Sequence, residues 1–151
     1  MRLSNLADYA VITMSQASTH CGDGRVSAAE LASETGLPVP TVQRLVSKLT
    51  AAGLLRSVRG AKGGLQLGRP AAAITVADIV EAVEGPIALT ACIDHASGCE
   101  YEAGCRMKPH WPIINDALRG ALASVTLETL RTPPRLAART PDTLSCKEEV
   151  A

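Results

Sequence analysis

Residues 27–67 constrain the fold of this chain more than any other stretch of it. Ser27 and Glu30 have the spacing of a capping box, in which the two side chains satisfy free backbone donors at the start of a helix. Gly36 is expected to end this helix, and Pro40 suits the first turn of the next one, where its missing N–H costs nothing. Two short helices joined by a few turn residues predict a helix-turn-helix.

A glycine-rich basic hairpin is predicted directly after these two helices. Gly53 ends the second helix, and two β-prone runs, 54–58 and 65–67, flank the sequence RGAKGG. Glycine-rich turns between β-prone runs are typical of hairpins. A hairpin in this position is the wing of a winged helix, so residues 1–70 are predicted to form a winged helix-turn-helix DNA-binding region.

Amphipathic helices are predicted before and after the helix-turn-helix and its wing. Between residues 3 and 17 the apolar residues recur at helical spacing and form one stripe, and Asp8 lies off that stripe. Thr75 is the predicted N-cap of a helix that ends at Gly85. Pro112 begins a last helix with a heptad-like apolar seam, which is adequate for pairing two subunits. The seam consists of Ile114, Leu118, Ala121 and Val125.

The predicted fold class is mainly α. Aromatic residues make up only 2% of the chain and Phe is absent, so the core must be built from Leu, Val, Ile and Ala, which are suited to helices. Residues 71–131 are predicted to hold a linker helix, a cysteine-rich loop and a long C-terminal dimerisation helix. Residues 132–151 are rich in Pro, Thr and charged residues, which predicts a disordered tail.

Charge is divided unevenly along a chain whose net charge is zero. Residues 1–70 hold eight Lys or Arg and four Asp or Glu, whereas residues 71–151 hold seven Lys or Arg and eleven Asp or Glu. The division indicates contact with a polyanion through the first half, although chance alone also produces an asymmetry of this size.

The candidate DNA contacts lie on the second helix of the helix-turn-helix and on the wing. They are Thr41, Gln43, Arg44, Lys48, Arg59 and Lys62. A recognition helix needs polar and basic side chains on its outer face, where Gln43 can pair with adenine and Arg44 with guanine or a phosphate. Lys48 is better placed for a phosphate, and the wing bases for the minor groove or the backbone. One such unit makes few phosphate contacts, so a homodimer on a palindromic double-stranded operator is expected.

Three of the five cysteines, Cys92, Cys99 and Cys105, fall within 14 residues. Structural zinc sites usually use cysteine pairs two to four residues apart, and this chain has none. The wider spacing suits a larger inorganic cluster. Three interpretations stay open on the residues alone: a cluster or metal site, a thiol switch, or free cysteines without a shared role. A fourth ligand could come from Cys21, Cys146, His95, His110 or Asp8.

Several classes of protein are not supported by the sequence. Arg2, Asn5 and Asp8 interrupt the N-terminal apolar residues, so no signal peptide is predicted, and no stretch approaches the ~20 apolar residues that span a bilayer. We therefore expect a cytoplasmic protein, in which an odd number of cysteines favours metal or redox chemistry over structural disulfides. No nucleophile–base pair or phosphate-binding loop is recognisable, so an enzyme is not predicted.

Four stretches together resemble the IscR, NsrR and SufR-type winged-helix regulators of the Rrf2 family. They are MRLSNLADYAV, LLRSVRGAKGGLQL, ITVADIVEAVEG and the three cysteines before a Trp-bearing helix. The resemblance covers about residues 1–130. It implies a homodimeric transcription factor whose loop is a cluster-binding loop, with Cys92, Cys99 and Cys105 as ligands of a 2Fe-2S or 4Fe-4S iron–sulfur cluster.

The resemblance also implies where the fourth ligand lies. IscR-like members use a His three positions after the last cysteine, but this chain has Lys108 there. NsrR-like members use an Asp from the first helix of the other subunit, and Asp8 matches that position. Asp8 supplied by the second subunit is therefore favoured, with His110 as the second choice.

Within the family, stretches such as KPHWPIINDALRGAL look most like regulators of SUF cluster-assembly operons. This likeness implies a repressor that holds its operator while clusters are plentiful and releases it when the cluster is lost. The alternatives are a nitric-oxide-sensing or redox-sensing repressor of the same family and a cluster-free thiol switch.

Overall fold

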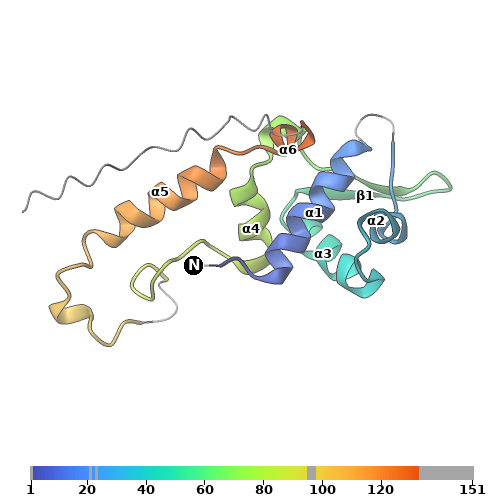
Figure 1. Cartoon of the computed structure of the whole chain (residues 1–151). Helices are drawn as coiled ribbons and strands as arrows, with labels where there is room; N and C mark the ends of the chain where they lie inside the picture. The colour runs from blue at the N-terminus through green and yellow to red at the C-terminus, as the bar shows by residue number, and fades with distance from the viewer. Residues whose placement is uncertain (1, 21, 23, 95–97, 133–151) are drawn as a thin grey trace, which may run out of the picture.

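The computed structural model describes residues 2–20, 22, 24–94 and 98–132, and it is mainly helical with one two-stranded sheet (Figure 1). The α-helices and strands are α1 Asn5–Thr19, α2 Ala28–Thr35, α3 Val39–Ala51, β1 Leu55–Val58, β2 Gly64–Leu67, α4 Val76–Glu84, α5 Trp111–Ala123 and α6 Leu127–Arg131. Two single-turn 3-10 helices, Ala71–Ala73 and Glu102–Gly104, complete the described elements. Apart from Thr132, the predicted tail lies outside the described residues.

The predicted boundaries of the helix-turn-helix are confirmed. The Glu30 N–H donates to Ser27 Oγ at 3.1 Å, and the Ser27 N–H donates to Glu30 Oε2 at 2.7 Å, which is a complete capping box. Gly36 ends α2 in the left-handed conformation with φ 72°, where a residue without Cβ is favoured. Pro40 lies in the first turn of α3.

The wing is also confirmed, with strand bounds within one residue of the prediction. Strands β1 and β2 are antiparallel, and their register runs from Leu55 opposite Leu67 to Val58 opposite Gly64. A further pairing, which the sequence did not indicate, joins Val26 to the middle of β2. The Val26 N–H donates to the Leu65 carbonyl at 3.3 Å, and the Leu65 N–H donates to the Val26 carbonyl at 2.8 Å. The wing is thereby fixed to the start of the helix-turn-helix.

One apolar core lies beneath α1, α2, α3, α4 and the wing. Its largest fully buried side chains include Met14, Leu31, Leu45, Leu49, Leu54, Leu55, Ile74, Ile79 and Leu127. The predicted dependence on aliphatic residues is confirmed. Leu3, which was placed on the apolar stripe of the first helix, is instead 43% exposed because α1 begins at Asn5.

The predicted C-terminal helix is shorter than the apolar seam implied. α5 ends at Ala123, and Val125 lies beyond it, where the Val125 carbonyl accepts the Val76 N–H at 2.9 Å. The chain then returns to the core through α6, since the Leu127 N–H donates to the Ile74 carbonyl at 2.8 Å and the Leu127 side chain is fully buried. Val125 therefore belongs to this return and not to the seam.

Residues 86–123 extend away from the winged helix and are here named the sensor arm (Figure 1). The described part of the arm contains the cysteine-bearing segment and α5. Two apolar side chains of α5 point to solvent, since Ile113 is 69% exposed and Ile114 is 42% exposed. None of the helices described is both long and apolar enough to cross a membrane.

Candidate DNA interface and cysteine loop

Helix α3 has a polar face exposed to solvent and an apolar face buried in the core. Val42 and Leu45 are fully buried, so their neighbours Gln43 and Arg44 are held at the exposed surface near the start of the helix. Thr41 is half-buried. The apolar contacts of α3 thus fix which side chains a nucleic acid would meet, as a recognition helix requires.

Lys48 lies differently from its predicted outward position. It is half-buried, and its Nζ donates to the Val83 carbonyl at 2.7 Å. Val83 is in the last turn of α4, where carbonyls lack partners within the helix and a positive charge is favourable. The ammonium group of Lys48 therefore joins α3 to the C-terminal end of α4.

The two predicted basic residues of the wing, Arg59 and Lys62, are exposed at its tip. The turn between them is closed by the Gly63 N–H, which donates to the Gly60 carbonyl at 2.8 Å. Arg25, which the sequence analysis did not select, donates from Nη1 to the Lys62 carbonyl and braces the tip. The tip is therefore held in place while its side chains remain accessible.

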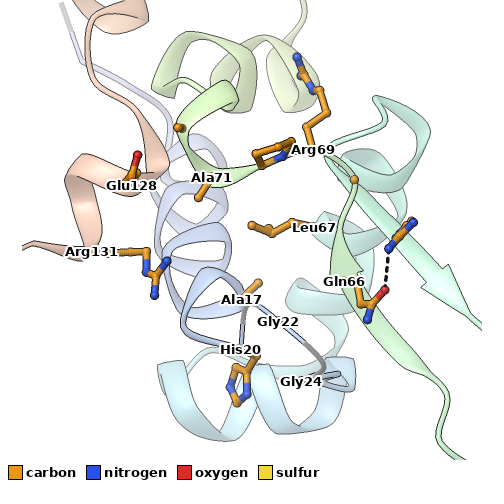
Figure 2. Close-up of a pocket in the computed structure, with 14 residues that line it drawn as sticks. Ala17, His20, Gly22, Gly24, Gln66, Leu67, Arg69, Ala71, Glu128 and Arg131 are labelled. Atoms are coloured by element: carbon orange, nitrogen blue, oxygen red, sulfur yellow. Dashed lines mark hydrogen bonds between the residues drawn. The ribbon is translucent and has the colours of Figure 1, made fainter.

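A pocket of about 500 Å³ lies at the base of the wing, between the end of α1, β2 and α6 (Figure 2). His20, Gln66, Arg69 and Arg131 approach it from different elements. Arg56 also lines the pocket, and its Nη2 donates across the hairpin to Gln66 Oε1 at 3.0 Å. Glu128 lines the pocket as well, so the three arginines there face one carboxylate.

The His20 side chain at the edge of this pocket is tied to the helix-turn-helix. His20 Nε2 and Glu34 Oε2 are 2.9 Å apart, and Gln16 Nε2 donates to the same oxygen at 2.8 Å. Both hydrogen bonds lower the pKa of Glu34 below its usual value, and the one with His20 has the larger effect. They connect the end of α1 with α2.

The three loop cysteines are free and half-buried. Cys92 Sγ lies 3.0 Å from Thr90 Oγ1, and the 3-10 turn Glu102–Gly104 separates Cys99 from Cys105. Among the described residues, no three His, Cys, Asp or Glu side chains lie close enough together to hold a metal ion. A set of three thiolates of this kind suits an iron–sulfur cluster chemically.

The candidate fourth ligands are not brought to the loop within one chain. Asp8 is exposed on α1, and its carboxylate makes no hydrogen bond or ion pair with the described residues. Figure 1 shows α1 in the winged helix, whereas the segment just before α5 lies at the far end of the sensor arm. His110 is exposed at the N-cap position of α5, while His95, Cys21 and Cys146 lie outside the described residues.

Sequence reasoning missed a group of polar residues that holds the sensor arm on α4. Arg119 binds Glu81 through two contacts, Nε to Oε1 at 2.8 Å and Nη2 to Oε2 at 2.9 Å. This pair lowers the pKa of Glu81 and raises that of Arg119. Asn115, buried one turn earlier on α5, binds the chain at residues 87–89. Their spacing of four on one helix face was the available signal.

Comparison with known proteins gives both a family match and individual relatives. A family model described as "Rrf2: Iron-dependent Transcriptional regulator" matches residues 3–133. The "HTH-type transcriptional regulator IscR" of Photorhabdus laumondii is 34% identical over 130 residues, which are 86% of this chain and 79% of that protein.

Two solved structures share the fold at comparable identity. CymR, the global cysteine regulator of B. subtilis, has a TM-score of 0.70 and 32% identity, and the match covers 87% of this chain and 96% of that one. IscR of T. potens has a TM-score of 0.66 and 30% identity, and the match covers 86% of this chain and 85% of that one. These proteins are regulators, which confirms the prediction that this chain is not an enzyme.

Proposed function

The chain belongs to the Rrf2 family of transcriptional regulators, and we propose that the state of an iron–sulfur cluster in its cysteine loop governs how tightly it binds its operator. The observation that carries the proposal is the combination, in one chain, of a winged helix with a loop of three free, half-buried thiols. The IscR relatives and the family description support the iron-dependent part.

The proposed DNA-binding form is a homodimer on a two-fold operator. The base contacts would come from Gln43 and Arg44, which are exposed on α3, with Thr41 beside them. Arg59 and Lys62 at the wing tip would contact the minor groove or the phosphates. Lys48 would bind a phosphate through the N–H groups that its contact with the Val83 carbonyl leaves free.

The proposed cluster ligands are Cys92, Cys99, Cys105 and Asp8 of the second subunit, with His110 as the second choice for the fourth position. Two observations support a contribution across the dimer: the Asp8 carboxylate is exposed, and the described residues of one chain contain no group of three possible metal ligands. A bound 2Fe-2S or 4Fe-4S cluster would supply a centre that oxidants or iron shortage can remove. An oxygen ligand is exchangeable, so the site would be labile, which suits a sensor.

The target genes that we propose are those of an iron–sulfur cluster assembly operon of the SUF type, under repression. In this arrangement, the dimer holds its operator while clusters are plentiful and releases it when they are scarce. The support is the likeness of the sequence around α5 to such regulators together with the IscR relatives.

Anaerobic purification tests the central proposal. The protein, reconstituted with iron and sulfide, should be coloured, contain iron and sulfide in comparable amounts, and bind a selected duplex with a different affinity from the apoprotein. A protein that stays colourless and free of iron after reconstitution would overturn the cluster proposal.

A thiol switch is the second candidate, and the three free cysteines are the observation that favours it. It predicts a disulfide within the loop after mild oxidation and a change in DNA affinity without any iron. A nitric-oxide sensor would instead retain its cluster under air or chelator and lose it rapidly with nitric oxide. Measuring cluster loss under air, chelator and nitric oxide separates the nitric-oxide sensor from the SUF-type regulator, and the absence of iron identifies the thiol switch.

A further inference from the structure

The recognition helix α3 begins with three exposed apolar residues. Pro38 is its N-cap, Val39 is its first residue and Pro40 follows, and all three are exposed to solvent. Val39 is 42% exposed, although burial of a valine side chain is favourable. Among the described residues, the apolar side chains that pack against the core include Leu37 and Val46 but not Val39. Packing within the fold therefore does not explain an apolar side chain at this position.

Val39 lies on the same side of α3 as Gln43. The two residues are four positions apart, so their side chains are about 40° apart around the helix axis and about one turn apart along it. Gln43 is exposed, and it is the proposed adenine contact. Ser47, one turn further along, donates its hydroxyl to the Gln43 carbonyl at 3.1 Å, so that hydrogen is not available to a base. This side of α3 therefore presents the methyl groups of Val39 and the amide of Gln43.

The backbone at this end of α3 leaves few groups that could bind a phosphate. Pro40 has no N–H, and the N–H groups of Thr41 and Val42 both donate to the Pro38 carbonyl, at 3.0 and 3.1 Å. Phosphates bind at helix N-termini through free N–H groups, and most of these are absent or already bound here. An apolar partner suits this end of the helix better than a phosphate does.

Thymine is the base that presents an apolar group in the major groove. Apolar side chains contact its C5-methyl, whereas the other three bases are recognised there through their donors and acceptors. Adenine, which a glutamine can bind through N6 and N7, always lies opposite a thymine. An apolar side chain and an amide one turn apart on a recognition helix thus match neighbouring A·T pairs.

We propose that Val39 is a specificity-determining residue that contacts a thymine methyl group in each operator half-site. One turn of α3 rises about 5.4 Å and one base pair about 3.4 Å, so this thymine lies within about two base pairs of the adenine that Gln43 binds. The inference rests on the proposed function, of which it specifies one base contact.

The test removes the methyl group from the DNA and the valine from the protein. The probe is a duplex selected from a random-sequence library with the full-length wild type. Each thymine is replaced in turn by deoxyuridine, which pairs in the same way but has no C5-methyl, and the replacement is made in both half-sites. Affinity at fixed salt is measured for the wild type and for Val39→Ala.

Two further variants complete the design. Ile12→Ala is the matched control, because it removes an apolar side chain of similar exposure, 39%, from α1. Gln43→Ala is measured on duplexes in which each base pair is replaced in turn. The base pair whose replacement no longer matters in this variant is the one that Gln43 contacts.

We expect the effects of deoxyuridine and Val39→Ala to be coupled at one thymine. Burial of one methyl group corresponds to about fourfold in affinity per half-site, so deoxyuridine there should weaken wild-type binding by about fifteenfold. In Val39→Ala the same replacement should weaken binding by less than about twofold, because the partner of the methyl group is already absent. Ile12→Ala should keep the full loss. A variant that only disturbed the start of α3 would lose the same factor on both duplexes.

The outcomes distinguish the inference from the proposal on which it rests. A wild type that selects no duplex, or a Gln43→Ala variant that keeps wild-type affinity for every duplex, overturns the proposed base contacts and this inference with them. Equal losses with deoxyuridine in the wild type and Val39→Ala, or no loss in either, overturn the inference alone. So does a selected operator with no thymine within about two base pairs of the Gln43 contact. If Val39→Ala does not fold, Val39→Ser decides, since it also removes both methyl groups.

Discussion

The winged helix and the sensor arm are held together by different forces. The winged helix surrounds an apolar core, whereas among the described residues of the arm Asn115 alone is buried. The arm is fixed by directional polar contacts from Asn115 and Arg119. Close apolar packing resists displacement in all directions, whereas a segment with few buried apolar contacts opens locally at a lower free energy. We therefore expect the arm to be displaced more easily than the winged helix.

Removing a core side chain should produce the largest change. Leu45→Ala leaves a cavity beneath the recognition helix and should lower the free energy of unfolding by about 2–5 kcal/mol. In the arm, Tyr101→Ala removes a side chain that is 79% exposed and should change the free energy of unfolding by about 0.5 kcal/mol or less. Urea unfolding of both variants measures the difference. Equal losses of stability would contradict the view that the winged helix depends on apolar packing more than the arm does.

Asp8→Ala should affect the cluster and leave the fold intact. Removing a residue that only supports a metal ligand weakens metal binding by about 10–100-fold, and removing a ligand itself should weaken it at least as much. The rate at which Asp8→Ala loses iron to a chelator can be monitored by visible absorption. It should be much higher than the rate for the control Asp116→Ala, which removes an exposed carboxylate from α5. A normal spectrum and normal release rate would remove Asp8 from the ligand set.

Arg59→Ala should weaken operator binding without changing the cluster. Because the substitution removes one phosphate-binding charge per subunit, it should reduce the salt slope by about one, uniformly across operator sequences. Arg2→Ala, which removes an exposed charge outside the wing, is the matched control. If affinity and slope both stay at wild-type values in fluorescence anisotropy, the wing tip does not contact DNA.

Glu81→Gln should have the smallest effect, visible as a change in pH dependence. Arg119 lowers the pKa of Glu81 in the folded state. The stability that the ionised carboxylate contributes is thus complete above its unfolded pKa and is lost as the pH falls through the folded pKa. The urea concentration at the unfolding midpoint should therefore change less between neutral and acidic pH in Glu81→Gln than in the wild type. An unchanged difference would show that the pair does not help to hold the arm.

The sequence predicted the winged helix well because its signals are local. The Ser27–Glu30 capping box, Gly36 and Pro40 each determine backbone geometry within a few residues, and the structure has all of them as expected. The basic hairpin was likewise predicted from composition and glycine spacing alone. Local signals of this kind need no knowledge of tertiary contacts.

The contacts that were not predicted depend on residues far apart in the chain. Lys48 was expected at the surface because helical periodicity does not show that α4 ends beside it. Val26 pairs with β2 as a single residue, and α6 has five residues, which are too few for a periodic pattern. The assignment of Asp8 and the three cysteines depends on a second subunit and on a bound cluster, and it remains a prediction.

The return of the chain after α5 determines how the sensor arm can move. The arm leaves α4 at its C-terminal end, after Glu84, and comes back to its N-terminal end, where Val125 and Leu127 pair with Val76 and Ile74. Because the arm is attached at both ends of α4, a displacement of the arm acts on the whole of that helix and not on one end alone. Changes in the cysteine loop should therefore reach the winged helix through α4 as a unit.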